Sequence, residues 1–449
     1  MKRSNIVYSF AALAALSLTA CKKDAQFSVS KGEADFSKYV AIGNSLTAGY
    51  ADNALYYEAQ VVSYPALMAK QFAQVGGGEF KQPLVPENSV GIGSAGNARL
   101  ALAVVNGALT PRPVAASGDL SIFTSSVAAQ GPFNNMGVPG AKVTTAVYPG
   151  YGNPANGAGN FNPFFTRMTT APASASMLTD AVTQQPTFFS VFLGSNDVLG
   201  YAISGGAGDV ITPMEGPAGI GFAASYETLI GALTANGAKG AVANIADVTT
   251  APYFTTIAHN SLVLTSQVLV DALNSAYAPL IQAGLCETFK LGANGFIIED
   301  EDSPVGMRQI RSGELVLLST PQDSLKSAGW GSAKPLANQY VLTAKELNNI
   351  RQATNAFNQK IKEIAAAKNL AFVDVASFLA KAKEHGIEAN GRKITTTFVT
   401  GGAFSLDGIH LTPIGSALLA NEFIKSINKT YNAAIPQVDV TRYGGVKFP

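Results

Sequence analysis

The chain has 449 residues with 31 basic against 30 acidic side chains, and charged residues make up only 14% of it. Such a chain has no basic stripe to neutralise phosphates, so binding to nucleic acid is not expected. An apolar fraction of 47% excludes a disordered protein, while 44 Gly and 22 Pro predict many loops around the core.

The first 20 residues resemble the signal peptide of a bacterial lipoprotein. Lys2 and Arg3 precede an apolar run, residues 6–18, that is too short to span a bilayer. The run ends in Leu-Thr-Ala-Cys21, which resembles a lipobox and implies cleavage before Cys21 and lipidation of its thiol. We therefore expect an extracytoplasmic lipoprotein that is anchored to a membrane through Cys21, with the outer membrane of a Gram-negative bacterium as its site. A plain secretory signal with an incidental cysteine is the alternative.

A polar tether is expected over residues 21–36, followed by a short buried strand from Tyr39 to Ile42. The strand stops at Gly43, and Ser45 lies in the turn after it. A small polar nucleophile after a central strand is a recurring way to expose a hydroxyl group. Glycine allows backbone to pass close to a substrate. Because Gly-x-Ser turns are common, an ordinary strand-to-helix turn is the alternative.

The next part of the chain predicts one helix, a loop-rich insertion and a second strand end. Residues 61–75 fit a helix with Pro65 in its first turn. The insertion contains a G-x-G-x-x-G match, Gly91 to Gly96, but prolines precede it and no clear helix follows. It is therefore read as a glycine-rich loop rather than a dinucleotide site. The segment from Phe133 to Gly140 reads as a strand end and a turn.

Residues 146–175 read as a long surface excursion rich in Asn, Gly, Pro and Phe. Phe161, Phe164 and Phe165 could line a pocket there, although packing of the loop on the body is the commoner outcome. Residues 187–193 predict a buried strand that ends in the segment Gly194 to Asp197.

From residue 187 to residue 427, strands and helices alternate. Strands are expected at 241–246 and 370–375, and helical periodicity at 222–235 and 253–285. Within residues 290–342, the segments 295–298 and 313–318 are expected to pair as strands. They flank the acidic run 299–302, which is read as a solvated turn with a calcium loop as the alternative. Thr343 and Glu346 form a capping box that starts a long helix. This alternation predicts a parallel sheet between helices.

A last polar constellation precedes the final helix. Thr412 is a good N-cap and Pro413 a good first residue, so a helix is expected to about residue 427. Asp407 and His410 lie in the loop before it, where a spacing of three can place the carboxylate beside the imidazole ring. A solvated or capping pair is the alternative for a lone D-x-x-H.

Four segments in this order resemble the sequence blocks of the SGNH (GDSL-type) hydrolase family. They are residues 43–46 (GNSL), 135–140 (NMGVPG), 194–197 (GSND) and 407–410 (DGIH). The resemblance covers residues 37–430, with a tail at 431–449. It implies an α/β fold, a three-layer α/β/α sandwich with a central parallel sheet (the flavodoxin-like SGNH hydrolase fold). Insertions at about 76–131, 146–180 and 290–342 have no counterpart in minimal members.

The resemblance also implies roles for individual residues. Ser45 would be the nucleophile, His410 its general base and Asp407 the acid that orients His410. The backbone N–H groups of Ser45 and Gly140 and the side-chain amide of Asn196 would form the oxyanion hole. No cofactor and no metal ion is implied.

Four features of the sequence stay open. Asn44 replaces the family's aspartate, which is not a member of the triad, so the chemistry should survive. Gly137 is an alternative to Gly140 as the oxyanion donor. His259 and His385 have no motif partner and are expected to serve packing or the surface. Cys286, left without a disulfide partner, is read as a small apolar filler, with a thiol nucleophile as the alternative.

The expected activity is a serine esterase or lipase that hydrolyses carboxylic esters through an acyl-enzyme. Its partner would be a small-molecule, glycan or lipid ester. A carbohydrate O-acetyl esterase is one alternative, and a non-catalytic surface lipoprotein that binds glycan or lipid is another, since a fold does not guarantee a function.

Overall fold

The computed structural model describes residues 28–93, 98–105, 107–114 and 125–449. The expected signal peptide, the lipidation site at Cys21 and the start of the tether lie outside the described residues, as do Ser94 to Gly96 of the glycine-rich loop. Among the helices of the described ranges, none has the length and the apolar character needed to cross a membrane.

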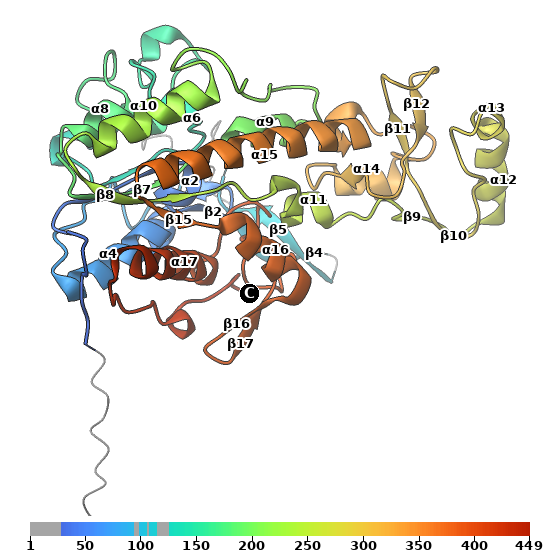
Figure 1. The fold of residues 1–449 in the computed structure, drawn as a ribbon. Helices are drawn as coiled ribbons and strands as arrows, with labels where there is room; N and C mark the ends of the chain where they lie inside the picture. The colour runs from blue at the N-terminus through green and yellow to red at the C-terminus, as the bar shows by residue number, and fades with distance from the viewer. Residues whose placement is uncertain (1–27, 94–97, 106, 115–124) are drawn as a thin grey trace, which may run out of the picture.

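A five-stranded parallel sheet forms the centre of an α/β fold (Figure 1). Its strands, in spatial order, are β15 (Ala371–Val373), β8 (Lys239–Ala243), β7 (Phe188–Phe192), β1 (Tyr39–Gly43) and β6 (Asn135–Gly137). The order reverses at β1, because β6 lies on one side of it and the later strands lie on the other. Open parallel sheets bind ligands beyond the carboxyl ends of the strands at such a reversal.

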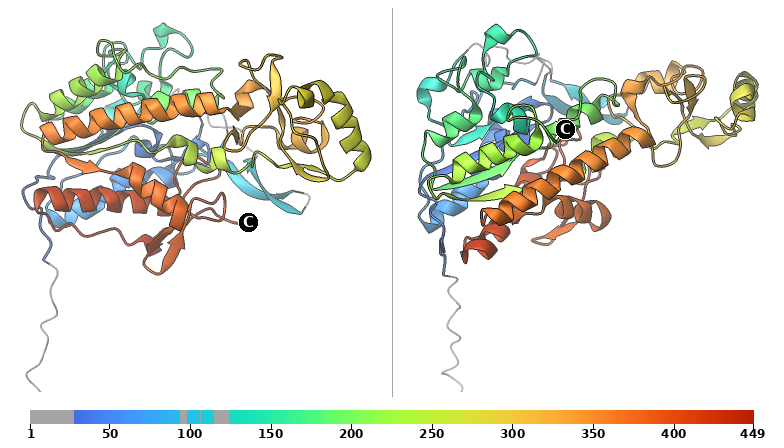
Figure 2. Two further views of the ribbon diagram at one scale, coloured as in Figure 1. Left: turned by 45° about the vertical axis from the view of Figure 1, so that its right-hand side comes forward. Right: turned by 45° about the horizontal axis from the view of Figure 1, so that its top comes forward.

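The side chains of β1 alternate between two hydrophobic cores. Val40 and Ile42 pack in one core and Tyr39 and Ala41 in the other. Figures 1 and 2 show α10 (Phe222–Thr234) and α15 (Ala344–Ala367) over one face, with α4 (Tyr64–Phe72) and α17 (Pro413–Tyr431) over the other. A strand covered on both faces needs apolar residues throughout, which explains the continuous apolar run.

The two long helices begin where the sequence predicts. Thr343 and Glu346 form the capping box that starts α15. Thr412 Oγ1 accepts the N–H of Gly415 at 3.2 Å at the start of α17, and Pro413 is the first helical residue. These predictions and the predicted helices at 61–75 and 222–235 are confirmed.

The remaining elements around the sheet are short. The helices are α2 (Ser45–Ala48), α3 (Tyr57–Gln60), α6 (Val143–Ala146), α7 (Pro163–Thr166), α8 (Met177–Val182), α9 (Asn196–Ile203), α11 (Pro252–Thr255) and α16 (Val375–His385). The antiparallel hairpins pair β2 (Tyr50–Ala51) with β3 (Ala54–Leu55), β4 (Leu100–Val105) with β5 (Ala108–Pro113), and β16 (Ile387–Ala389) with β17 (Arg392–Ile394).

Residues 257–342 form a lobe that projects beside one end of α15 (Figures 1 and 2). It has a hydrophobic core of its own, in which Cys286 is buried as the expected apolar filler. Its elements are β9 (Leu262–Leu264), α12 (Gln267–Ala276), α13 (Ala278–Gln282), β10 (Gly292–Asn294), β11 (Ile297–Glu299), β12 (Met307–Gln309), β13 (Leu315–Val316), α14 (Gln322–Ser327) and β14 (Val341–Leu342). The helical stretch expected at 253–285 is therefore interrupted by β9. The insertion that was expected to begin at about residue 290 begins earlier, with the lobe at residue 257.

The pairing predicted within the lobe is wrong. Segments 295–298 and 313–318 both contain strands, but β11 pairs with β12 and β13 pairs with β14. The acidic run lies in the turn between β11 and β12, so these two neighbouring strands form a hairpin. β13 is then left to pair with β14, the strand before α15. The turn is also only partly solvated, because Asp300 is 9% exposed.

The lobe is tied to α15 by a buried ionic network. The Arg308 guanidinium donates to Asp300 and, through two bonds of 2.7 Å each, to both oxygens of Glu314. Glu314 also accepts the backbone N–H of Ala344, the first residue of α15, at 3.1 Å. Arg308 and Glu314 side chains are only 6% and 3% exposed, so each charge depends on the other.

Replacing Arg308 with Ala is expected to lower the free energy of unfolding by about 3–5 kcal/mol, because Glu314 and Asp300 stay buried without a cation. Denaturant unfolding measures the change. The matched control is Lys345→Ala, which removes an ion pair with Asp302 whose side chains are 61% and 57% exposed, and which should leave stability nearly unchanged. Equal effects of the two substitutions would contradict the account of the network.

Candidate active site

Ser45 begins a short helix directly after β1. Adding a Cβ to Gly43 would bring it within 1.8 Å of Thr47 Oγ1, so only glycine lets the helix fold back this closely on the strand. Asn44 caps the helix, because its Oδ1 accepts the N–H of Leu46 at 3.0 Å. Ser45 is the first residue of α2 and therefore has a backbone N–H without an acceptor inside the helix.

Ser45, His410 and Asp407 form a continuous hydrogen-bonded chain of side chains. His410 Nε2 lies 2.8 Å from Ser45 Oγ, and His410 Nδ1 lies 2.9 Å from Asp407 Oδ2. An ionised carboxylate only accepts hydrogen bonds, so Nδ1 carries a proton and Nε2 is free to accept the proton of the serine. The Tyr50 ring packs on the imidazole with a distance of 4.7 Å between ring centroids.

Asp407 is held in its ionised form by its surroundings. Its Oδ1 accepts the backbone N–H groups of Ile409 and His410, at 2.9 and 2.8 Å. Its Oδ2 accepts the N–H of Asn53 at 2.8 Å as well as the bond from the His410 ring. Burial alone would raise the pKa of Asp407, but the adjacent His410 and these donors outweigh it and hold the pKa well below the usual carboxyl range.

The hairpin of β2 and β3 presents Asn53 to Asp407, a contact that the sequence did not indicate. Asp52 and Asn53 are its two turn residues, with φ angles of 51° and 64°, as in the type I′ turns that favour Asp and Asn. Asp52 fastens the hairpin to the loop before His410, since its Oδ1 accepts the N–H of Leu406 at 3.0 Å. The turn type could be predicted from Asp52 and Asn53 alone. The contact of Asn53 with Asp407, 354 residues away, could not.

The turn from Val138 to Ala141 lies beside the Ser45 turn. The N–H of Val138 donates to the carbonyl of Gly43 at 3.0 Å. Gly140 has no acceptor for its N–H among the described residues. The N–H of Gly137 instead donates to Asn135 Oδ1 at 2.9 Å, and a Cβ on Gly137 would lie 2.3 Å from the backbone of α2. Of the two candidate glycines, only Gly140 therefore has an N–H that is available to a ligand.

Asn196 begins α9 after β7 and faces the same turn. One hydrogen of its side-chain amide is bonded to the carbonyl of Ala141 at 2.9 Å. The second hydrogen has no acceptor in the part of the chain that the structure describes. Ser45, Gly140 and Asn196 thus each retain one N–H donor, at the carboxyl ends of three adjacent strands. Such convergent donors can stabilise an oxygen that becomes negative during a reaction.

Asp197 is hydrogen-bonded to the segment that follows this turn and does not face the site. It is fully buried, and its Oδ2 accepts the N–H of Val143 at 2.9 Å. Its Oδ1 is buried without a hydrogen-bond partner among the described residues. Burial raises the pKa of Asp197 to about 6, against the opposing effect of the Val143 N–H.

This pKa predicts a pH dependence of stability that Asp197→Asn should abolish. A raised pKa in the folded state means that the contribution of Asp197 is favourable below about pH 4 and is lost as the pH rises through about 6. Between about pH 4 and pH 7, the wild type should lose up to about 3 kcal/mol relative to Asp197→Asn in denaturant unfolding. Parallel profiles of the two proteins would contradict this prediction.

An open cleft of about 900 Å³ has Gly140 in its wall. The excursion at 146–175 supplies most of the lining, with the amides of Asn156, Asn160 and Asn162 beside aromatic rings. Phe161 is one of these rings. Phe164 and Phe165 are buried in the core instead, as packing of the loop on the body predicts. The cleft is therefore polar and aromatic, and it opens beside one of the candidate oxyanion donors.

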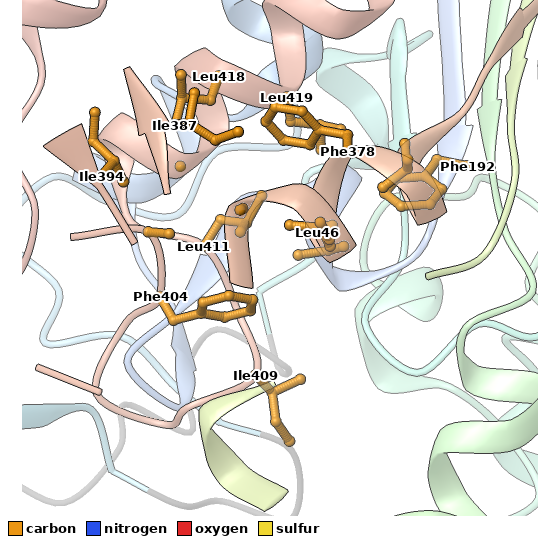
Figure 3. Close-up of a pocket in the computed structure, with 15 residues that line it drawn as sticks. Leu46, Phe192, Phe378, Ile387, Ile394, Phe404, Ile409, Leu411, Leu418 and Leu419 are labelled. Carbon is orange, nitrogen blue, oxygen red and sulfur yellow. The ribbon is translucent and has the colours of Figure 1, made fainter. Parts of the chain in front are cut away.

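A second, apolar cavity of about 60 Å³ lies between the His410 loop, α16 and α17 (Figure 3). Its wall includes Leu46, Ile409 and Leu411, the chain neighbours of Ser45 and His410. The cavity therefore lies next to the segments that carry Ser45 and His410, although neither of these two residues lines it.

The other residues singled out in the sequence lie apart from this constellation. His385 is 65% exposed at the end of α16, and the carbonyl of His259 accepts the N–H of Phe296 in the lobe. Burial raises the pKa of the Cys286 thiol to about 11, which leaves little thiolate at neutral pH. Among the described residues, no group of three or more His, Cys, Asp or Glu side chains could hold a metal ion.

Comparison of the chain with protein-family models and with curated proteins gives no match in either case.

Proposed function

We propose that the protein is a serine hydrolase of carboxylic esters. The observation that carries the proposal is the unbroken chain from Ser45 Oγ through the His410 ring to a buried, ionised Asp407. This arrangement makes a serine hydroxyl nucleophilic near neutral pH. Acyl transfer also requires donors that stabilise the negative oxygen, and the N–H groups of Ser45, Gly140 and Asn196 beyond the strand ends can serve as these donors.

The reaction follows from these positions. Ser45 Oγ attacks the ester carbon while His410 Nε2 takes its proton, and Asp407 stabilises the imidazolium that forms. The carbonyl oxygen becomes negative and is bound by the N–H groups of Ser45 and Gly140 and by the Asn196 amide. His410 then protonates the departing alcohol, leaving an acyl group on Ser45. Water, activated by His410, releases the acid and restores the serine.

The fold supports this proposal at a finer level. Numbered along the chain, the strands of the sheet have the order 2-1-3-4-5, and helices cover both faces. That order is the flavodoxin-like one, in which the ligand site lies where the strand order reverses. We therefore propose the three-layer sandwich of the SGNH hydrolases for residues 37–430. The lipobox-like segment ending at Cys21 supports a lipid-anchored, extracytoplasmic enzyme.

The cleft beside Gly140 favours a second candidate for the substrate. The cleft has Gly140 in its wall, so an ester whose carbonyl oxygen is bound by the Gly140 N–H lies beside it. Amide side chains both donate and accept hydrogen bonds, and the aromatic rings offer flat apolar faces. Such a lining suits a hydroxylated alcohol, as in a carbohydrate O-acetyl ester, better than a fatty acyl chain.

A series of esters tests the activity and the substrate class together. The purified chain without residues 1–21 is assayed on p-nitrophenyl esters from acetate to dodecanoate and on acetylated oligosaccharides. Rising kcat/KM with acyl length indicates a lipase, while a preference for acetylated saccharides indicates a carbohydrate esterase. Binding of a glycan or lipid without turnover of any ester would contradict the proposed function and indicate a binding protein.

A further inference from the structure

The Val138 to Ala141 turn has a middle peptide that can face either way. The N–H of Ala141 donates to the carbonyl of Val138 at 3.0 Å, Pro139 is the second residue and Gly140 the third, with φ of 83°. This is a type II β-turn. A type I turn keeps the same end residues and the same closing hydrogen bond, but it reverses the peptide between the second and third residues.

That peptide carries the N–H of Gly140. In a trans peptide the carbonyl of Pro139 and the N–H of Gly140 point in opposite directions. Proline suits the second position of both turn types, and glycine tolerates φ of either sign. The turn residues alone therefore leave the direction of the Gly140 N–H undecided.

The hydrogen bonds that anchor the two ends of the turn do not fix the direction of the Gly140 N–H either. Val138 N–H binds the carbonyl of Gly43, and Ala141 carbonyl accepts from the Asn196 amide. Both groups belong to peptides outside the middle one. They hold the turn in place beside Ser45, whichever way its middle peptide faces.

Asn162 is the side chain that contacts the middle peptide. Its Nδ2 donates to the carbonyl of Pro139 at 2.8 Å and to the hydroxyl of Tyr151 at 2.9 Å. The Tyr151 hydroxyl is itself held, because Tyr151 is 8% exposed and its ring stacks on that of Phe165. The Asn162 amide is thus held by Pro139 on one side and by Tyr151 on the other, and it belongs to an excursion that the sequence predicted only as a surface loop.

We propose that Asn162 is a positioning residue, which holds the Pro139 carbonyl and thereby keeps the N–H of Gly140 turned towards the oxyanion. The inference rests on the proposed function, because it assigns a device that serves the same site. It explains why a loop far from Ser45 in sequence reaches back to the turn after β6. Asn162 acts through the peptide and does not itself touch the reacting atoms.

Asn162 also caps a helix, so a test of its positioning role must leave this cap intact. Its Oδ1 caps α7 by accepting the N–H groups of Phe164 and Phe165, at 3.0 and 3.2 Å. Asp and Ser are also good caps, but neither can donate to the Pro139 carbonyl from the same rotamer. Asn162→Asp and Asn162→Ser therefore keep the cap and remove the bond to the turn. Asn153→Ser is the matched control, since Asn153 caps a turn of the same loop by accepting from Ala155.

The expected result is a loss confined to the transition state. Removing one oxyanion donor typically lowers the rate by about 10²–10³, so a donor that is only misdirected part of the time should lower kcat by about tenfold to a hundredfold. With p-nitrophenyl acetate, which carries no hydroxyl groups for the amides of the cleft to bind, KM should stay unchanged, because the Gly140 N–H acts little on the ground state. Affinity for an alkyl boronic acid, which forms a tetrahedral adduct with Ser45, should fall in parallel with kcat. Asn153→Ser should keep wild-type values.

Gly140→Ala probes the same peptide from the other side. A Cβ there meets nothing closer than Asn162 Nδ2 at 3.7 Å, so space is not limiting. A φ of 83° is strained for alanine, and the variant should favour the type I turn. We expect its kcat and its boronate affinity to fall at least as far as those of Asn162→Asp.

The inference is overturned if folded Asn162→Asp keeps wild-type kcat, or if kcat falls while boronate affinity is unchanged. Should Asn162→Ser fail to fold, Asn162→Asp, which keeps the helix cap, decides the matter. If the wild type hydrolyses esters and these variants match its kcat and its boronate affinity, only the positioning role is refuted. A wild type that is inactive and unreactive with boronates refutes the proposed function itself.

Discussion

Replacing Ser45 with Ala is expected to lower kcat for a short p-nitrophenyl ester by about 10⁴–10⁶-fold. The alanine lacks the oxygen that attacks the ester, and no other side chain lies within hydrogen-bonding distance of His410 Nε2 among the described residues. The oxyanion donors and the cleft remain, so KM should change little and a small residual rate over water should persist. Initial rates at saturating ester measure the loss.

Ser195→Ala is the matched control. Ser195 follows β7 much as Ser45 follows β1, and its side chain makes no capping hydrogen bond. It should keep wild-type kcat. An equal loss in both variants would point to a general effect on the strand ends, and full activity of Ser45→Ala would refute Ser45 as the nucleophile.

Asp407→Asn should lower kcat by about 10⁴-fold, as expected for a triad that loses the carboxylate behind its histidine. The asparagine amide can no longer accept from His410 Nδ1 while also accepting from Asn53, Ile409 and His410 N–H groups. The ring then rotates or adopts the other tautomer, and Nε2 no longer accepts the serine proton. Asp439→Asn, at an exposed carboxylate that caps a turn, is the control.

The same substitution has a consequence for stability that depends on pH. Because the pKa of Asp407 is depressed in the folded protein, its stabilising contribution is present above the unfolded carboxyl range of about 4 and is lost as the pH falls below it. The wild type should therefore gain stability over Asp407→Asn as the pH rises from about 2 to 5. A constant difference between the two over that range would contradict the ionised state assigned to Asp407.

Local sequence signals were enough to predict the α/β fold and its central parallel sheet. Continuous apolar runs such as Tyr39 to Ile42 mark strands that are covered on both faces, and β1 is such a strand. The capping box at Thr343 fixes a helix start through neighbouring residues alone. Ser45, Asp407 and His410 could be proposed as one site because the segments that carry them resemble, in their order, the sequence blocks of the SGNH (GDSL-type) hydrolase family.

The supporting contacts could not be predicted, because they join segments that are far apart in the chain. Asn53 reaches Asp407 across 354 positions, and Asn162 reaches the turn at Pro139 from a loop without a repeating pattern. Strand pairing in the lobe was wrong for a related reason. Each of its strands is two or three residues long, so the hydrophobic pattern cannot specify a partner.

The central claim is that Ser45 carries the acyl group, and covalent labelling tests it most directly. The wild-type protein is treated with a fluorophosphonate, and the modified peptide is identified by mass spectrometry. We expect one adduct per chain, on the peptide that contains Ser45, and none in Ser45→Ala or after prior loading of the site with the boronic acid. An enzyme that turns over esters while its adduct lies on another residue, or forms equally in Ser45→Ala, would contradict the account.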